Sequence, residues 1–405
     1  MSLIKRDPAQ PWHPAFWLAS LGAGGLSISF FMYLMWMIPH PDHPMPVWSD
    51  LVLAVQGGAP LAPGVRSVAV LATLFMVVLA LLHLVLLVWN FREHQRAKLT
   101  ETYTKLKNSP AEVQFMAQPL TLAMTVNVCF ASGALFVPGL WSVVEYLFPL
   151  AVVAFGVLGV WSLRLYGRYL ARYLAKGGFK PEEHNHLSGL MAVFTFSMLS
   201  VGFAAPAAMS HIKAISAVAG TFSILFMVIA VIVAFLVLAS GAQAMMQFGL
   251  QAQATPSIWM MVPILTLLGI EWVRMQHGLA HHFQTPIVPG VLFTTITAIF
   301  MSQLLILAIG YRVMILNGYL KSHLVGDQRS PVSFGLICPG VAIVVMGMFW
   351  WHLAWVKTGI VEPFSVVYWL GILALAIVQI MTVLALLHLT SRLLSHKSVV
   401  IASAQ

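Results

Sequence analysis

The amino-acid sequence predicts an all-α integral membrane protein with ten transmembrane helices, arranged as five helical hairpins around a central pore. Composition, long apolar stretches and segregated basic residues all favour this fold class. Of the 405 residues, 60% are apolar and only 8% are charged, whereas soluble domains carry roughly 25% charged residues. Such a chain cannot cover a water-facing surface, so we expect lipid to surround most of it.

The apolar stretches set the number of membrane spans. A bilayer core of about 30 Å requires about 20 apolar residues per helix. The N-terminal segment lacks the pattern of a cleavable signal peptide, so we expect the first stretch to remain as a helix. We treat 1–405 as a single transmembrane domain. The predicted helices cover residues 15–38, 66–90, 119–138, 141–163, 187–209, 212–239, 256–276, 287–310, 332–355 and 364–389.

The distribution of Lys and Arg predicts the orientation. If the chain crosses the membrane ten times, 17 of the 21 basic residues fall on the side of the two termini, and the other four are Arg66, Lys213, Arg274 and Lys357. Cytoplasmic segments carry the excess of Lys and Arg, so both termini are expected in the cytoplasm. We expect a multi-pass protein of the cell inner (plasma) membrane. The basic excess is then a topology signal, and nucleic-acid binding is not expected.

An internal repeat is indicated by the spacing of the odd-numbered helices. From the third onward they begin near Pro119, Leu187, Pro256 and Pro331, at intervals of 68, 69 and 75 residues. A regular period of this kind is typical of one helical hairpin copied several times. The long connection 39–65, rich in Pro and Gly, is expected to form an ordered external loop or a partial lid.

Small and polar residues concentrate in the odd-numbered helices. Examples are Gly24 and Gly25 in the first, Asn127 in the third and Thr195 in the fifth. Such residues lie either at close helix–helix contacts or along a cavity. We therefore predict an inner ring of odd helices and an outer ring of even ones, with tight packing and no pore as the alternative.

Two prolines lie inside odd-numbered spans, Pro263 in the seventh and Pro339 in the ninth. Proline cannot donate a helical hydrogen bond, so each is expected to bend its helix and to free a backbone carbonyl. A ring of bent helices would narrow a pore near the middle of the membrane.

These features together resemble a known family. Ten spans in five hairpins, the glycine-rich first helix LGAGGLSISFF and a ninth helix with a central proline are similar to the tellurite-resistance and C4-dicarboxylate transporter family, which includes the plant slow-type anion channels. The opening stretch HPAFWLASLGAGGLSISFFMYLMWMIPHP is closer still to the TsoY family, some of whose members are selenoproteins.

The resemblance implies an inner five-helix pore, gated by a Phe on the ninth helix, in proteins that often form homotrimers. Where the family commonly has Phe-Pro, this chain has FGLICPG, with Cys338 before Pro339. The resemblance thus places Cys338 at the gate and makes it the counterpart of a selenocysteine, with Phe334 the nearest aromatic residue. From the residues alone, Cys338 is either a packing residue or a pore-lining thiol with redox or metalloid chemistry.

Several polar residues in apolar surroundings remain open to two interpretations. Glu271 and Arg274 form either an interfacial ion pair or part of an outer vestibule. His277 and His281 have the spacing of metal ligands, but no carboxylate or cysteine completes a site, so they and His282 are equally explained as interfacial histidines. Histidines within spans suggest haem as an alternative, and these are His83, His352 and His388.

Our functional prediction is a passive or ion-coupled transporter or channel for a small inorganic or carboxylate anion. No nucleotide-binding loop or hydrolase motif occurs in a suitable setting, so no enzymatic activity, metal or cofactor is expected. The alternatives are a membrane redox protein that uses Cys338, a haem- or quinone-linked subunit, and a structural membrane subunit. The predicted pore and gate residues are Gly24, Gly25, Asn127, Thr195, Pro263, Phe334, Gly335, Cys338 and Pro339, with Glu271 and Arg274 in the outer vestibule.

Overall fold

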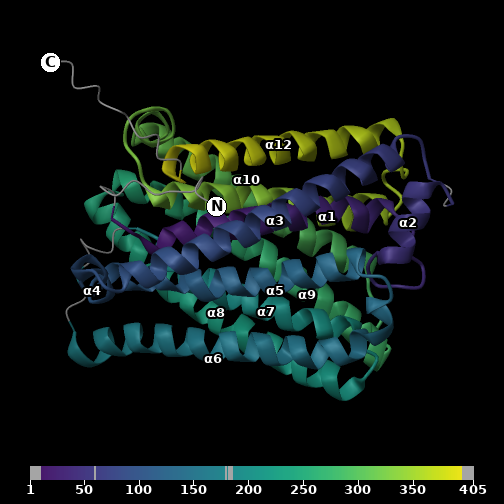
Figure 1. Cartoon of the computed structure of the whole chain (residues 1–405), viewed down its shortest axis with the longest axis horizontal. Helices are drawn as coiled ribbons and strands as arrows, with labels where there is room; N and C mark the ends of the chain where they lie inside the picture. Colours follow the sequence, from purple (N-terminus) through teal and green to yellow (C-terminus); the bar gives the residue numbers. More distant parts are fainter. Residues whose placement is uncertain (1–10, 59–60, 178–179, 181–185, 395–405) are drawn as a thin grey trace.

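The computed structural model describes residues 11–58, 61–177, 180 and 186–394, and all regular structure in these residues is helical. Ten of the helical segments are long and apolar enough to cross a membrane, as predicted. They lie side by side, with the short α4 at one end of the bundle and α2 at the other (Figure 1). The ten segments are Pro14–Met37, Val65–Ala97, Pro110–Phe136, Leu140–Ala175, Leu190–Met209, Lys213–Phe248, Ala252–Phe283, Pro289–Leu316, Pro331–Val356 and Val366–Leu394.

Each span contains one long α-helix, and several begin with a short 3-10 helix. The odd-numbered spans contain α1 (Trp17–Met37), α5 (Ala117–Phe136), α7 (Leu190–Met209), α9 (Met261–Phe283) and α11 (Ile337–Phe349). The even-numbered spans contain α3 (Val65–Ala97), α6 (Val144–Lys176), α8 (Lys213–Phe248), α10 (Pro289–Leu316) and α12 (Val366–Leu394).

Burial separates these two groups of helices. In the most apolar 18-residue stretch of each odd span, 44–94% of the residues are buried inside the protein, whereas in the even spans the share is 22–33%. The odd helices are therefore the inner ones. Their lower apolar content follows, because a helix that contacts other helices does not have to face lipid.

The packing of the helices is consistent with this division. Going around the bundle, α1 contacts α5, α5 contacts α7, α7 contacts α9, α9 contacts α11, and α11 contacts α1 again. The five inner helices thus form a closed ring. Each outer helix packs on the inner helix before it: α3 on α1, α6 on α5, α8 on α7, α10 on α9 and α12 on α11.

Three outer helices are longer than the sequence predicts, because α3, α6 and α8 continue 7–13 residues beyond the predicted ends of their apolar stretches. At 1.5 Å per residue, the 33 residues of α6 span about 50 Å, well beyond the bilayer core. Hydropathy does not detect such extensions, since polar and charged residues interrupt their apolar residues while the helix continues.

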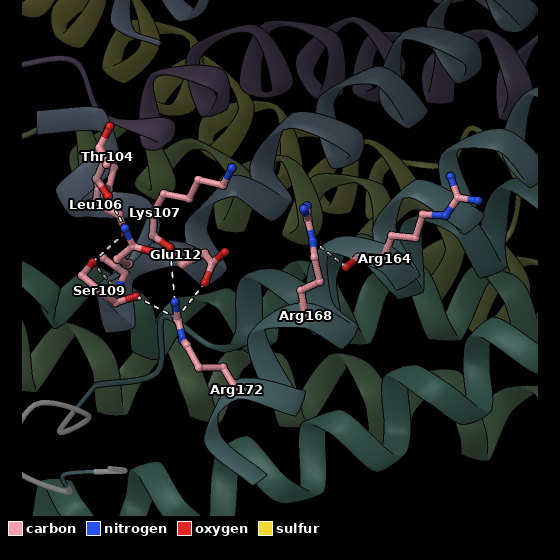
Figure 2. A network of polar contacts seen from close by, with 10 residues as sticks. Thr104, Leu106, Lys107, Ser109, Glu112, Arg164, Arg168 and Arg172 are labelled. Carbon is pink, nitrogen blue, oxygen red and sulfur yellow. Dashed lines mark hydrogen bonds and ion pairs between the residues drawn. The ribbon is translucent and has the colours of Figure 1, made fainter. Parts of the chain in front are cut away.

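Side-chain contacts hold the extension of α6 in place at the end of the bundle that carries α4 (Glu101–Lys107) (Figure 2). The Arg172 guanidinium lies 2.7 Å from the Glu112 carboxylate. It also donates to the carbonyl oxygens of Lys107 and Ser109. Arg172 therefore ties the connection between α3 and α5 to α6.

Three prolines of the inner helices lie close to the start of an α-helix. Pro119, Pro263 and Pro339 each occupy the third position of α5, α9 and α11, directly after a 3-10 helix. Pro263 and Pro339 each lie in the first α-helical turn after the 3-10 segment, so the change from 3-10 to α geometry falls beside a residue that supplies no backbone N–H. The bend and the freed carbonyl at each of these prolines remain predictions.

The connection 39–64 is ordered in its described residues. It contains α2 (Trp48–Gln56), which packs against α3 and α5 at the end of the bundle opposite α4. Residues before α2 cover part of a cavity inside the ring, as the predicted lid would.

Candidate functional site

Two cavities are lined mainly by the inner helices, and the larger also reaches the outer helices α6 and α12. The larger, which we call the outer cavity, has a volume of about 850 Å³. Its rim includes the exposed residues Asp42, His211 and Lys357, so it opens at the end of the bundle that carries α2. The smaller, the inner vestibule, has a volume of about 240 Å³, and its rim includes the exposed Gln251 and Gln253 at the opposite end.

The two cavities approach each other deep inside the ring. Three residues line both of them: Phe194 of α7, Pro263 of α9 and Cys338 of α11. We call these three residues the septum. The same three side chains therefore lie between two spaces that open at opposite ends of the bundle.

The repeated architecture explains why these residues meet. Phe194, Pro263 and Cys338 each lie in the first turn or so of an inner α-helix, near the same end of the ring. In α9 and α11 the septum residues follow directly on a 3-10 helix. A junction between 3-10 and α geometry is a frequent location for a hinge.

Six of the eleven predicted site residues line these cavities. Gly25, Asn127 and Arg274 line the outer cavity, and Gly335 lines the inner vestibule. Pro263 and Cys338 line both. The Asn127 amide nitrogen lies 3.4 Å from the Met198 sulfur, on the neighbouring wall of the outer cavity.

The other five predicted residues lie outside both cavities. A Cβ atom on Gly24 would come within 2.8 Å of the His83 ring, so this glycine permits close packing of α1 on α3. The Thr195 hydroxyl is buried and donates to the Met116 and Met191 carbonyls. Phe334 is fully buried beside Phe16, with ring centroids 6.4 Å apart. Pro339 and Glu271 also line neither cavity.

Glu271 and Arg274 do not form the ion pair that their spacing suggests. The Glu271 carboxylate is buried and accepts a hydrogen bond from Ser223 of α8 at 3.0 Å. The Arg274 guanidinium donates to the Val201 carbonyl of α7 at 2.8 Å and lines the outer cavity. Arg274 thus contributes a positive charge to the cavity wall, while Glu271 joins two helices.

The lining of the inner vestibule is mainly apolar and, among the described residues, includes no Lys, Arg, Asp or Glu. His13 is one of its residues, and its Nδ1 atom accepts a hydrogen bond from the backbone N–H of Ala15. Burial lowers the pKa of His13 to about 4, so its ring is neutral near pH 7. The N-terminal ends of the inner helices surround this vestibule, which favours a positive potential there.

Three histidines gather near the rim of the outer cavity. The ring of His281 lies 4.4 Å from that of His282 and 5.1 Å from that of His211. The His282 Nε2 donates to the Ser210 carbonyl, and the His277 Nδ1 donates to the Val273 carbonyl. Within the described residues, no group of three or more His, Cys, Asp or Glu has a geometry suited to a metal ion.

The histidines considered as haem ligands are already hydrogen-bonded. Both ring nitrogens of His83 have partners, on Ser20 and Thr125. His352 is held by the Met348 carbonyl and the Tyr368 hydroxyl, and the His388 Nε2 contacts the Leu324 carbonyl. Since an axial ligand requires a free ring nitrogen, His83 and His352 do not fit haem as they are arranged here.

Sequence reasoning missed Phe194, one of the three septum residues. It lies in the apolar stretch LMAVFTFSML, where nothing distinguishes it from the nearby Phe196. Phe196 packs instead on Tyr166 and Phe226. Helical phase decides which of the two faces the ring axis, and the sequence does not fix that phase.

The fold and the cavities define a multi-pass, all-α membrane protein with two opposed cavities inside a ring of five helices. No known protein-family model matches the chain, and no curated protein matches it. The function is therefore inferred from the site itself.

Proposed function

We propose that the protein conducts a small anion across the membrane, through the ring of inner helices and across the septum. One observation carries this proposal: two cavities from opposite ends of the bundle share Phe194, Pro263 and Cys338. The occluded arrangement suits a gated channel or an ion-coupled transporter, in which the site opens to one side or the other.

The preference for an anion rests on the charges along the path. Arg274 is the charged residue that lines the interior of the outer cavity. Lys357 and Asp42 lie on the rim of this cavity, and Asp42 is the one acidic residue among the described residues of the lining. At the other end, the helix N-termini around the inner vestibule stabilise negative charge. An anion therefore meets favourable potential on both sides of the septum.

The proposal includes the orientation and the assembly. Both termini face the cytoplasm of the cell inner membrane, because 17 of the 21 basic residues lie at the ends and connections on that side. Five hairpins surround the path, as the resemblance to the tellurite-resistance and slow-type anion channel family implies. On this proposal the inner vestibule is cytoplasmic, and a homotrimer is the expected assembly.

Anion flux in liposomes tests the proposal. Replacing the ring of Phe194 in Phe194→Ala removes the largest side chain of the septum, so we expect flux to rise about tenfold, which corresponds to about 1.4 kcal/mol of barrier. The matched control is Phe222→Ala, which removes a lipid-facing ring 41% exposed on α8. Absence of flux for chloride, nitrate, sulfite and malate in both variants and in the wild type would contradict the proposal.

A second candidate is thiol chemistry by Cys338, favoured by the position of its side chain at the junction of the two cavities. An anion that crosses the septum would pass this sulfur. The variant Cys338→Ser discriminates between the two functions: a pure conduit keeps its flux, whereas a thiol-dependent process loses its activity while the protein stays folded.

A further inference from the structure

The size of the outer cavity does not match a small inorganic ion. Its volume of about 850 Å³ lies in the range of about 300–1,000 Å³ that is typical of sites for drug-sized molecules. Such sites combine a mostly apolar wall with a few convergent polar groups. The outer cavity has both features: its wall is apolar near the septum and carries polar groups toward its mouth.

One face of α9 carries both the apolar and the polar residues of this wall. Pro263, Leu267, Ile270, Arg274 and His277 follow one another at intervals of three or four residues, and all line the outer cavity. At 1.5 Å per residue, the 11 steps from Pro263 to Arg274 correspond to about 16 Å along the helix. The face is therefore apolar near the septum and cationic toward the mouth.

The facing walls have the same apolar character near the septum. Met124, Phe130, Met198, Val341 and Val345 line the cavity from α5, α7 and α11. Methionine side chains are flexible and polarizable, so they adapt to apolar bodies of irregular shape. The Thr266 hydroxyl, which also lies here, is satisfied by the Ala342 carbonyl.

Arg274 retains donors for a ligand. A guanidinium carries five N–H groups, and one of them is used by the Val201 carbonyl. Glu271, three residues before Arg274 on α9, is bonded to Ser223 instead. A fixed guanidinium of this kind binds a carboxylate or a sulfonate through two parallel hydrogen bonds.

We infer that the outer cavity is a binding site for an amphipathic organic anion, whose carboxylate or sulfonate lies on Arg274 and whose apolar body extends toward the septum. The site needs only the cavity and does not depend on conduction. Its ligand enters from water, because the exposed residues Asp42, His211 and Lys357 surround the mouth. A ligand seated there covers the outer side of the septum.

Binding of octanoate to the protein in phosphatidylcholine nanodiscs tests this inference. Titrations are followed by tryptophan fluorescence, to which Trp36 and Trp141 of the cavity wall contribute. Because each buried methylene adds to the affinity, octanoate should bind at least tenfold more tightly than acetate. It should also bind at least tenfold more tightly than octyltrimethylammonium, and its affinity should be the same in nanodiscs that contain phosphatidylglycerol.

Variants test the binding of the charged group and of the apolar body of the ligand separately. Arg274→Gln should remove the preference for octanoate over octyltrimethylammonium, whereas Arg66→Gln, a basic residue of the same side outside the cavity, should preserve it. Leu267→Trp should lower the octanoate affinity about tenfold and leave acetate binding unchanged, and Arg274→Lys should keep the preference for the anion.

Two results would overturn the inference. One is equal binding of octanoate and the cation by the wild type, and the other is unchanged octanoate binding in both Arg274→Gln and Leu267→Trp. If Arg274→Gln does not fold, Leu267→Trp and Arg274→Lys decide the outcome. These binding measurements involve no transport. A negative result would therefore contradict the binding site without contradicting anion conduction.

Discussion

The consecutive helices α7 and α8 have opposite surroundings. In the most apolar stretch of α7, 94% of the residues are buried inside the protein, against 28% in α8. Yet α7 carries three hydroxyl residues among its 20 residues, Thr195, Ser197 and Ser200, all fully buried. In α8 the lipid-facing surface is almost purely apolar, and Ser223 faces α7 instead.

This difference teaches how the bundle is held together. Lipid offers no hydrogen bonds, so a polar group in a span has to find its partner on a neighbouring helix. Ser200 and Ser223 do this reciprocally: each hydroxyl donates to the backbone carbonyl of the other residue, at 2.9 and 3.0 Å. Polar residues thus mark the contact between inner and outer helices as well as the cavity wall.

The largest effect is expected for glycines at this contact. In Gly202→Ala, the new methyl group of α7 would come within 2.4 Å of the Phe155 ring of α6. We expect a loss of about 1–3 kcal/mol in the free energy of unfolding, because the packed ring has to move. Thermal unfolding in detergent measures it.

The matched control is Gly156→Ala on α6, where nothing lies within 4 Å of the new methyl group. It should be neutral, or stabilising by roughly 0.5–1 kcal/mol, as expected for alanine in a helix. Equal losses in the two variants would show that the Phe155 ring of α6 does not pack against α7 at Gly202.

A smaller effect is expected for the hydrogen bonds between the inner and outer helices. Ser223→Ala removes the donor to Glu271 and to the Ser200 carbonyl, so we expect a loss of about 1 kcal/mol in the free energy of unfolding. Thr221→Ala, two residues away, removes a hydroxyl that bonds only within α8 and should change little. A difference near zero between the two variants would remove the role we assign to Ser223.

A separate effect, which depends on pH, is expected from His13. Its pKa is lowered to about 4 in the folded protein, from an ordinary value of 6.5. The unfolded chain then binds the proton first, so this contribution to stability is present above about pH 6.5 and is lost as the pH falls toward 4. In His13→Asn, which keeps an acceptor for the Ala15 N–H, the unfolding temperature should fall less between pH 7 and pH 5 than in the wild type. An identical fall in both proteins would contradict a neutral His13 in the folded protein.

The sequence predicts the number of spans and the inner or outer position of each helix, because composition reports contact with lipid directly. It also locates Cys338, Pro263 and Arg274, since a thiol, a proline and a charge are rare inside spans. Thr195 and Gly24 are equally unusual but serve helix packing, and Phe194 is inconspicuous. Which side of a helix faces the ring axis depends on packing with its neighbours, and an inner helix surrounded by protein has no apolar stripe to reveal it.

The central claim is that the two cavities meet at the septum. Labelling of Cys338 by a small charged methanethiosulfonate reagent tests it most directly, in Cys129→Ser proteoliposomes of known orientation, because Cys129 is exposed on α5 and would also react. A cysteine introduced at Met348, buried in α11 outside both cavities, is the control and should stay unmodified. The account predicts modification of Cys338 by reagent added to either side of the membrane. Protection of Cys338 from both sides, or reaction from one side alone, would contradict it.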